Sequence, residues 1–239
     1  MISTFTGIAS GFLRSPLYQL FCTETTLTPE VSEAGKIIIL DLPVKEFNEA
    51  GRAAQVLFKY LWQRWVERRQ ITPQSRPVFL WADESQYFVN EHDASFQTTA
   101  RSARACTVFL TQNIPNYYAM IGGGDAKRAF VDSLVGNLTT KFFHNNSDTT
   151  TNKWAAELFA QDWQQISGHS IGLGPKDGGA SVNLNNSQQL VYTVPPRAFT
   201  NLAKGGPLHD FGVEAIVHQG GKIFAGSGLN ALRTRFSQR

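Results

Sequence analysis

Short blocks of wholly apolar residues alternate with amphipathic stretches up to residue 160. A block of four or five apolar residues with β-branched members is typical of a strand buried on both faces of a parallel sheet. Apolar residues at three- and four-residue steps instead predict a helix with one buried side. The predicted strands are 37–40, 77–81, 107–110 and 138–143, and the predicted helices are 46–69, 93–104 (with Asp93 as its N-cap), 126–135 and 147–159. This alternation predicts an α/β fold, a doubly wound and mostly parallel sheet with flanking helices.

The pattern changes after residue 160. Gly, Asn and Ser dominate 167–189, which predicts a loop or a mobile hairpin. A short β-run follows at 190–194, and 213–218 with 222–224 reads as a C-terminal β-hairpin turning at Gly220-Gly221. We therefore expect three segments in the chain: a lead-in segment, a core of alternating strands and helices, and a C-terminal extension whose strands belong to the same domain. These are 1–34, 35–160 and 161–239.

Composition narrows the class of protein only modestly. The chain has 239 residues, 42% hydrophobic and 17% charged, as is ordinary for a globular protein. A net charge of +3 is compatible with nucleic acid or a membrane surface but diagnostic of neither. The two cysteines, Cys22 and Cys106, form no metal-binding spacing, so we expect a reducing compartment, with Cys106 as a small core residue. No apolar run approaches the roughly 20 residues that span a bilayer.

Two adjacent carboxylates, Asp83 and Glu84, follow the predicted strand 77–81. Ligands of open α/β sheets bind at the carboxyl ends of the strands. In ATPases of the P-loop class, the first carboxylate of such a pair holds Mg²⁺, usually through water, and the second orients the water that attacks the γ-phosphate. The alternative is a solvated strand end with two surface acids.

Gln112 stands in the corresponding place after the next predicted strand, 107–110. If these two strands are neighbours, its amide lies beside Asp83 and Glu84 and can contact both the attacking water and a phosphate oxygen. The alternative is an amide that only caps the strand end. Arg101 and Arg104 precede the same strand, and either guanidinium could reach the γ-phosphate bound by a neighbouring subunit. Arginines on a helix surface are the commoner case.

The sequence lacks a phosphate-binding loop of the form G-x-x-x-x-G-K-[ST]. Its Gly-Lys pairs, Gly35-Lys36 and Gly221-Lys222, are each followed by Ile and have no glycine at the required distance. The run Gly122-Gly123-Gly124 has no lysine after it. We therefore expect the chain alone not to bind a nucleoside triphosphate tightly and to be inactive in hydrolysis unless a Walker A half completes it.

Three long stretches resemble the C-terminal half of the TraG/TraD coupling proteins of type IV secretion, a family of FtsK/HerA-like P-loop ATPases. They begin IIILDLPVKEFNEAG, RPVFLWADESQYFVN and VGNLTTKFFHNNSDT, and the ending from QLVYTVPPRAF onward is similar to that family's tail. The resemblance runs from about Thr26 to the end and includes the TraM-recognition region. It implies a RecA-like fold in which 35–160 are the C-terminal half of the ATPase core and the N-terminal Walker A part is missing. It implies that Asp83 and Glu84 are the Walker B pair, Gln112 the sensor and Arg101 the arginine finger, with Arg104 as second choice. Ala160 stands where the family commonly has glycine.

The family's activity sets further expectations. Its members are hexameric motors that use ATP and Mg²⁺ for DNA translocation in conjugation, coupling single-stranded DNA and relaxosome proteins to a type IV secretion channel. They lie at the cytoplasmic face of the bacterial inner membrane, held by N-terminal helices. Neither those helices nor the Walker A lysine is in this sequence, so we expect this chain to be soluble.

Other interpretations stay open at this stage. The chain could be a non-catalytic binding module that docks relaxosome or secretion-channel proteins, or a RecA-like ATPase unrelated to conjugation. Lys127, Arg128 and Lys141 could touch DNA phosphates, although solvated surface cations are the commoner case.

Overall fold

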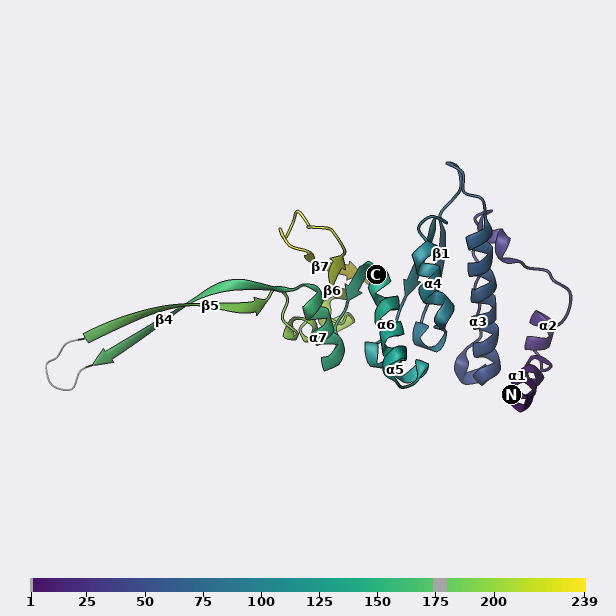
Figure 1. Ribbon diagram of the computed structural model, residues 1–239, viewed down its shortest axis with the longest axis horizontal. Helices are drawn as coiled ribbons and strands as arrows, with labels where there is room; N and C mark the ends of the chain where they lie inside the picture. The colour runs from purple at the N-terminus through teal and green to yellow at the C-terminus, as the bar shows by residue number, and fades with distance from the viewer. Residues whose placement is uncertain (1, 174–179) are drawn as a thin grey trace. The chain divides into compact units, whose positions relative to one another are not determined.

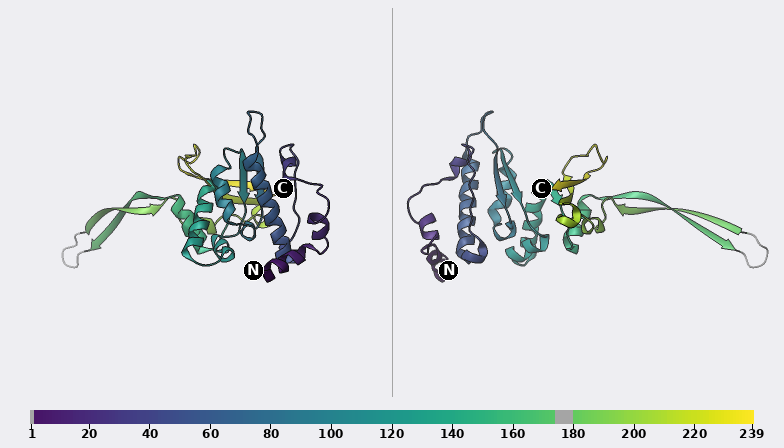
Figure 2. Two further views of the ribbon diagram at one scale, coloured as in Figure 1. Left: turned by 45° about the vertical axis from the view of Figure 1, so that its right-hand side comes forward. Right: turned by 180° about the vertical axis from the view of Figure 1, so that it is seen from behind.

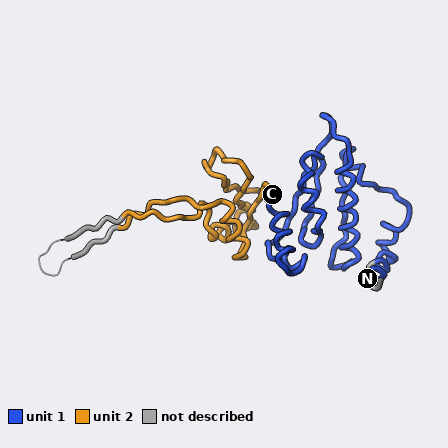
Figure 3. The backbone as a smooth tube through the Cα atoms, in the orientation of Figure 1, with its two compact units in different colours: residues 1–138 blue, residues 139–239 orange. Residues whose placement is uncertain are grey.

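The computed structural model describes residues 2–173 and 180–239 (Figure 1). They fall into two compact units, Met1–Leu138 and Thr139–Arg239, coloured blue and orange in Figure 3. The helices of the first unit are α1 (Ile2–Phe12), α2 (Leu17–Phe21), α3 (Val44–Arg68), α4 (Glu91–Thr99), α5 (Ile114–Ile121) and α6 (Asp125–Asn137), with 3-10 turns η1 (Pro29–Ser32) and η2 (Ser85–Tyr87). Its strands are β1 (Val78–Ala82) and β2 (Ala105–Phe109).

Strands β1 and β2 form a parallel pair, with Val78 opposite Ala105 and Ala82 opposite Phe109. Helices α3 and α4 cover one face of this pair. The hydrophobic cluster between them and the strands contains Trp62, Val66, Val78, Phe96, Ala100 and Ala103, with Leu80 and Ala105 packed against it. Alternation along a strand explains this, because Val78 and Leu80 point to the same face. A second cluster joins Phe109 at the end of β2 to α5 and α6 through Tyr117, Val131 and Leu134.

The second unit contains β3 (Thr140–Phe143), α7 (Thr149–Leu158), β4 (Gln161–Leu173), β5 (Ala180–Tyr192), α8 (Arg197–Thr200), η3 (Pro207–His209), β6 (Gly212–Gln219) and β7 (Ala231–Ser237). An antiparallel sheet of order β3-β6-β7 packs on α7 and α8 around Phe159, Phe199 and Ile216. Strands β4 and β5 pair with each other in a long antiparallel hairpin, seen from two further directions in Figure 2. No helix in the described ranges is long and apolar enough to cross a membrane.

The α/β class is confirmed, with a parallel pair, flanking helices and antiparallel strands in the C-terminal part. The predicted strand 37–40 is wrong: this segment forms neither a helix nor a strand, and Ile37 and Ile39 are 88% and 82% exposed. Its apolar pattern fits a buried strand, but burial requires a neighbour. The strand predicted at 138–143 exists as β3, yet it pairs antiparallel with β6 instead of joining the parallel pair.

Three local predictions also need correction. Strand β6 pairs with β7, whereas Phe224 in the predicted partner 222–224 makes only an isolated bridge to Leu229. Asn90 is the N-cap of α4, and Asp93 is the third residue of the helix, where its carboxylate accepts from the Asn90 N–H. Cys106 is exposed because it lies on the face of β2 opposite to the helices.

The segment 167–189, predicted as a loop or hairpin, belongs to the β4–β5 hairpin as far as it is described; 174–179 lie outside the described residues. In the sequence, the boundary between the compact units lies between residues 138 and 139. The division into a lead-in segment, a core and an extension stays a prediction.

Candidate functional site at the carboxyl ends of β1 and β2

The two parallel strands end at one edge of the sheet, and backbone hydrogen bonds continue beyond them. The Leu110 N–H donates to the carbonyl of Ala82 at 2.9 Å, and the Ser85 N–H donates to the carbonyl of Leu110 at 2.9 Å. The segments 82–85 and 109–112 therefore stay side by side after the regular strands stop. This pairing brings the residues that follow β1 next to those that follow β2.

Glu84 adopts the left-handed backbone conformation, with φ 46° and ψ 44°. A residue with a Cβ pays about 1–3 kcal/mol for such a conformation, and strained residues of this kind cluster at functional sites. The conformation turns the chain sharply from β1 into η2. The fixed pairing of Ser85 with Leu110 holds the turn in place.

The Glu84 carboxylate accepts hydrogen bonds from two side-chain amides. Gln112 donates from Nε2 to Oε1 at 2.9 Å, and Gln86 donates from Nε2 to Oε2. Gln86 is only 3% exposed, and its own Oε1 accepts from Thr111 Oγ1 at 2.8 Å. Two hydrogen bonds between side chains thus link the turn after β1 to the segment after β2, in addition to the backbone bond of Ser85. The structure places Glu84 and Gln112 side by side, as their positions after neighbouring strands predict.

Asp83 lies beside this pair and is exposed. Its Oδ1 accepts from the Glu84 N–H at 2.9 Å. No ion pair joins Asp83 or Glu84 to a cation within the ranges that the structure describes, and no group of three or more His, Cys, Asp or Glu there could hold a metal ion. Two carboxylates nevertheless suit Mg²⁺, which keeps several of its waters and takes one or two protein carboxylates beside phosphate oxygens.

Tyr117 of α5 lies under the turn. Its hydroxyl is hydrogen-bonded to Ser85 Oγ, which in turn donates to the carbonyl of Leu110 at 2.8 Å. Burial raises the pKa of Tyr117 to about 12, since the charged phenolate is disfavoured away from water. The phenol therefore stays neutral at physiological pH and acts as a fixed hydrogen-bonding group beneath the turn.

A buried ion pair anchors the chain that leaves the site. Lys59 of α3 donates to Asp93, which is fully buried, and to the carbonyl of Phe88 at 2.6 Å. Gln63 donates to the other oxygen of Asp93 at 2.7 Å. Burial lowers the pKa of Lys59, and the nearby charge of Asp93 acts in the opposite direction. These contacts tie α3 and α4 to the segment just after η2.

Arg101 does not join Glu84 and Gln112 in this chain. It is exposed and precedes β2, so the five residues of that strand, about 16 Å long, separate it from the carboxyl edge. Its reach toward a neighbouring copy stays a prediction. Arg104 has a local role, because its guanidinium donates to the carbonyls of Pro73 and Ser75 at 3.1 and 2.6 Å.

The cations considered for DNA contact each have a local partner. Lys127 donates to the carbonyl of Ile121 at 2.9 Å, and Arg128 lies 5.2 Å from the ring centroid of Tyr118. Lys141 lies 5.8 Å from the ring centroid of Trp154, and burial lowers its pKa. Lys127 and Arg128 belong to the first unit and Lys141 to the second. A DNA-binding role for them stays a prediction.

The second face of the β1–β2 pair carries apolar side chains that no described helix of the first unit covers. Phe79 is 55% exposed, Trp81 67% and Leu110 43%, and Cys106, opposite Phe79 in the register, is exposed as well. Strands that are apolar on both faces are typical of parallel sheets with helices on both sides. By alternation, Asp83 continues the side of Trp81, so the acidic edge borders this open face.

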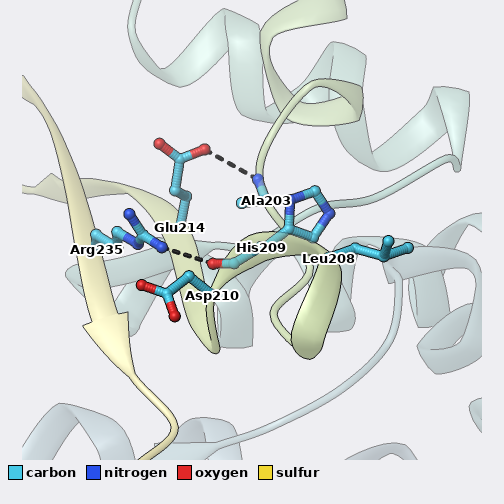
Figure 4. A pocket seen from close by; sticks show the side chains of 6 residues that line it. All are labelled: Ala203, Leu208, His209, Asp210, Glu214 and Arg235. Atoms are coloured by element: carbon cyan, nitrogen blue, oxygen red, sulfur yellow. Dashed lines mark hydrogen bonds between the residues drawn. The ribbon is translucent and has the colours of Figure 1, made fainter.

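A shallow pocket of about 310 Å³ lies elsewhere, in the second unit (Figure 4). Glu214 accepts there from the Ala203 N–H at 2.9 Å, and Arg235 donates to the carbonyl of His209 at 2.6 Å. Asp210 lies 3.3 Å from Arg239. These charged groups connect β6 and β7 to the loop between α8 and β6, so they already have partners within the unit.

No protein-family model matches this chain. No curated protein matches it. Among solved structures, the chain is similar to the "bacterial conjugative coupling protein TrwBdeltaN70" in its unbound monoclinic form, with 13% identity and a TM-score of 0.45. The match covers 74% of this chain and 35% of that one, so the chain spans about a third of that protein's length.

Sequence reasoning missed Gln86, Thr111 and Tyr117 as parts of the site. Gln86 follows Glu84 by two residues and lies in η2, which is hydrogen-bonded to the segment after β2. Its burial depends on contacts made across the sheet, which no local pattern shows. Thr111 stands beside Gln112 and could have been named with it, because consecutive polar residues at a strand end are a signal for this edge.

Proposed function

We propose that this chain is part of an ATP-dependent motor of conjugative DNA transfer, one that couples relaxosome and single-stranded DNA to a type IV secretion channel. One observation carries the proposal: the 2.9 Å hydrogen bond from Gln112 to Glu84 across the carboxyl ends of two adjacent parallel strands. A carboxylate and an amide in this arrangement suit the activation of a water and the sensing of a phosphate. The sequence resemblance to TraG/TraD coupling proteins supports conjugation over another use of the same chemistry.

The residues have separate roles in this proposal. Asp83 would hold Mg²⁺ through water, and the metal would neutralise phosphate charge when bound. Glu84 orients and polarises the attacking water, and Gln86 fixes the direction of its carboxylate. Gln112 and the attacking water both hydrogen-bond to Glu84. Gln112 directly precedes Asn113, the N-cap of α5, so a change at the nucleotide can be transmitted to that helix.

The triphosphate needs a cationic holder that this sequence does not encode. We propose that a Walker A half completes the site, and that in the completed protein a homo-hexamer at the inner membrane brings Arg101 of one copy to the next. The open face of Phe79, Trp81 and Leu110 borders the acidic edge, which supports a missing layer on that side.

Mutation of Glu84 tests the proposal. The chain is joined or co-expressed with a polypeptide that carries G-x-x-x-x-G-K-[ST], and ATP hydrolysis is measured. Glu84→Gln should lower turnover by about 10²-fold or more, because it removes the water-polarising charge. Glu91→Gln makes the same change at an exposed acid outside the site and should leave turnover unaltered. Hydrolysis at the normal rate in Glu84→Gln would overturn the assignment.

The second candidate is a non-catalytic module that docks relaxosome or secretion-channel proteins. The uncovered apolar face of β1–β2 favours it, since large exposed apolar groups mark binding surfaces. Titration of the purified chain with ATP and Mg²⁺ tests whether the chain alone binds nucleotide. We expect no submicromolar binding, and submicromolar binding would show that the chain holds nucleotide by itself. The sequence just upstream of Met1 separates the two candidates, because a Walker A motif there favours the motor.

A further inference from the structure

Thr111 follows β2 by two residues and is hydrogen-bonded to the turn after β1. Its Oγ1 donates to Oε1 of Gln86 at 2.8 Å. The carbonyl oxygen of Asn113 lies 3.4 Å from the same hydroxyl. A hydroxyl carries a single proton, and the shorter distance assigns that proton to Gln86. Thr111 is therefore the donor to the carbonyl side of the Gln86 amide.

The Gln86 amide is held on both sides. The residue is only 3% exposed, so bulk water has little access to it. Its Oε1 accepts from Thr111, and its Nε2 donates to Oε2 of Glu84. An amide turned by half a rotation would present its carbonyl oxygen to a carboxylate oxygen, and two acceptors repel each other. The Thr111 hydroxyl thus stabilises the orientation in which the Gln86 N–H groups face Glu84.

The plane of the Glu84 carboxylate depends on the groups that its oxygens contact. The last torsion of a glutamate side chain has a broad distribution, so the side chain alone does not set this plane. Gln112 donates to Oε1, and Gln86 donates to Oε2. A donor at each oxygen fixes the plane, and one of these two donors is itself held by Thr111.

Backbone pairing by itself does not orient the Gln86 amide. The N–H and the Oγ of Ser85 both donate to the carbonyl of Leu110, which keeps the turn beside the segment after β2. This pairing sets Gln86 close to Thr111, but the last torsion of a glutamine side chain is as broad as that of a glutamate. The Thr111 hydroxyl supplies the remaining constraint. A methyl group in its place would occupy a similar volume without donating a hydrogen bond.

We propose that Thr111 is a positioning residue for ATP hydrolysis: its hydroxyl orients the Gln86 amide, and that amide orients the Glu84 carboxylate toward the attacking water. This role rests on the proposed function, because Glu84 must polarise that water for Thr111 to affect turnover. Thr111 acts through Gln86. Loss of its hydroxyl should misdirect the carboxylate and leave nucleotide binding intact, so the turnover number should fall without a change in KM for ATP.

Thr111→Val tests the proposal, since valine keeps the branched shape of threonine and lacks the hydroxyl. ATP hydrolysis is measured in the completed protein, well below its melting temperature. The turnover number should fall about tenfold, because the catalytic carboxylate is misplaced, and KM for ATP should stay within about twofold. Thr111→Ser keeps the donor and should retain at least about half of the wild-type turnover number.

Thr107→Val is the matched control. Oγ1 of Thr107, in β2, accepts from Nε2 of Gln97 at 2.8 Å, so this variant also breaks a hydrogen bond between a threonine and a glutamine. Thr107 lies outside the site, and the variant should leave the turnover number within about twofold. Equal losses in Thr107→Val and Thr111→Val would show a general effect of disturbing this part of the chain and would overturn the proposal.

The carboxyl ¹³C resonance of Glu84 in the full chain alone gives a second readout, one that requires no hydrolysis. Glu84→Gln identifies the resonance, because it removes the carboxyl group. Thr111→Val should shift this resonance by more than Thr107→Val does, since the donor to Oε2 is disturbed. Thr111→Ser should leave it near its wild-type position. An unchanged resonance in Thr111→Val would mean that Thr111 does not orient Glu84.

The same set of variants separates failure of the Thr111 proposal from failure of the proposed function. Normal hydrolysis in Glu84→Gln would remove the step that Thr111 serves, and both proposals would fall. If Glu84→Gln abolishes turnover and Thr111→Val does not lower it, only the role of Thr111 falls. The same holds if Thr111→Ser is as slow as Thr111→Val, since the hydroxyl is then not what matters, or if Thr111→Val raises KM at an unchanged turnover number.

Discussion

Gln112 donates a hydrogen bond of 2.9 Å to the carboxylate of Glu84, although 27 residues lie between them in the sequence. The bond crosses from the end of one parallel strand to the end of the next. Gln86 holds the second oxygen of the same carboxylate. Glu84 is therefore oriented by two amides from different segments, and its direction is fixed before any ligand is present.

The buried pair of Lys59 and Asp93 should contribute strongly to stability. Asp93→Ala removes the partner of Lys59 and of Gln63, and it also removes the acceptor of the Asn90 N–H. We expect a loss of about 3–5 kcal/mol in the free energy of unfolding, because one buried charge is left unpaired. Urea denaturation measures it. Glu91→Ala, at an exposed position of the same helix, is the control, and equal midpoints for the two variants would contradict the prediction.

Tyr117 should make stability depend on alkaline pH. Its pKa is about 12 in the folded chain, against about 10 for a free phenol. Because the folded state holds this proton more tightly, the contribution is complete below pH 10 and is lost as pH rises toward 12. The free energy of unfolding should fall by up to ~3 kcal/mol across this window.

Tyr117→Phe isolates this effect, since Tyr118, whose pKa is also raised to about 12, is present in both chains. The variant should cost about 1 kcal/mol at neutral pH through the lost bond to Ser85. Urea midpoints at about pH 8 and about pH 11 should converge or cross, because only the wild-type chain loses the Tyr117 contribution. Equal changes of the urea midpoint with pH in both proteins would show that the pKa of Tyr117 is not raised in the folded chain.

Cys106 should react with a thiol reagent in the folded chain. It lies on the uncovered face of β2 and is exposed, as is Cys22 in the segment after α2. Alkylation followed by peptide mass spectrometry should show both cysteines modified under native conditions. A completing polypeptide that covers the face should then protect Cys106 and leave Cys22 reactive. Modification of Cys106 only after denaturation would mean that the chain already covers this face.

Ala160 should be a site where glycine stabilises the protein. It follows α7 with φ 64°, a conformation that costs a residue with a Cβ about 1–2 kcal/mol. Ala160→Gly should therefore raise the free energy of unfolding by about 1 kcal/mol. Ala156→Gly, inside α7 and fully buried, should lower it by at least about 1 kcal/mol. A melting temperature lowered by Ala160→Gly would contradict this reading of the turn.

The sequence predicted those features that depend on local periodicity and on order along the chain. The apolar stripe of 46–69 corresponds to α3, and two apolar blocks correspond to β1 and β2. From the sequence, Gln112 was expected beside Glu84 on the condition that these two strands are neighbours. The parallel register of β1 and β2 meets this condition, so the contact follows from the order of residues after each strand.

Features that depend on distant partners were not predictable in the same way. Residues 37–40 have the pattern of a buried strand, but pairing needs another strand beside them. Cys106 is small and adjoins an apolar block, which fits burial, yet no described helix of its own unit covers its face of β2. Gln86 is buried, and its amide is hydrogen-bonded to Thr111, which lies 25 residues away in the sequence, as well as to Glu84.

The measurement that tests the central claim most directly is a double-mutant cycle on ATP turnover in the completed protein. Gln112→Ala alone should lower the turnover number by about 10²-fold, because it releases the carboxylate that positions the water. Added to Glu84→Gln, it should lower turnover little further, since the two side chains act as one unit. If the double variant instead loses turnover by the product of the two single losses, as independent residues do, Glu84 and Gln112 do not act as one unit, and the proposal is contradicted.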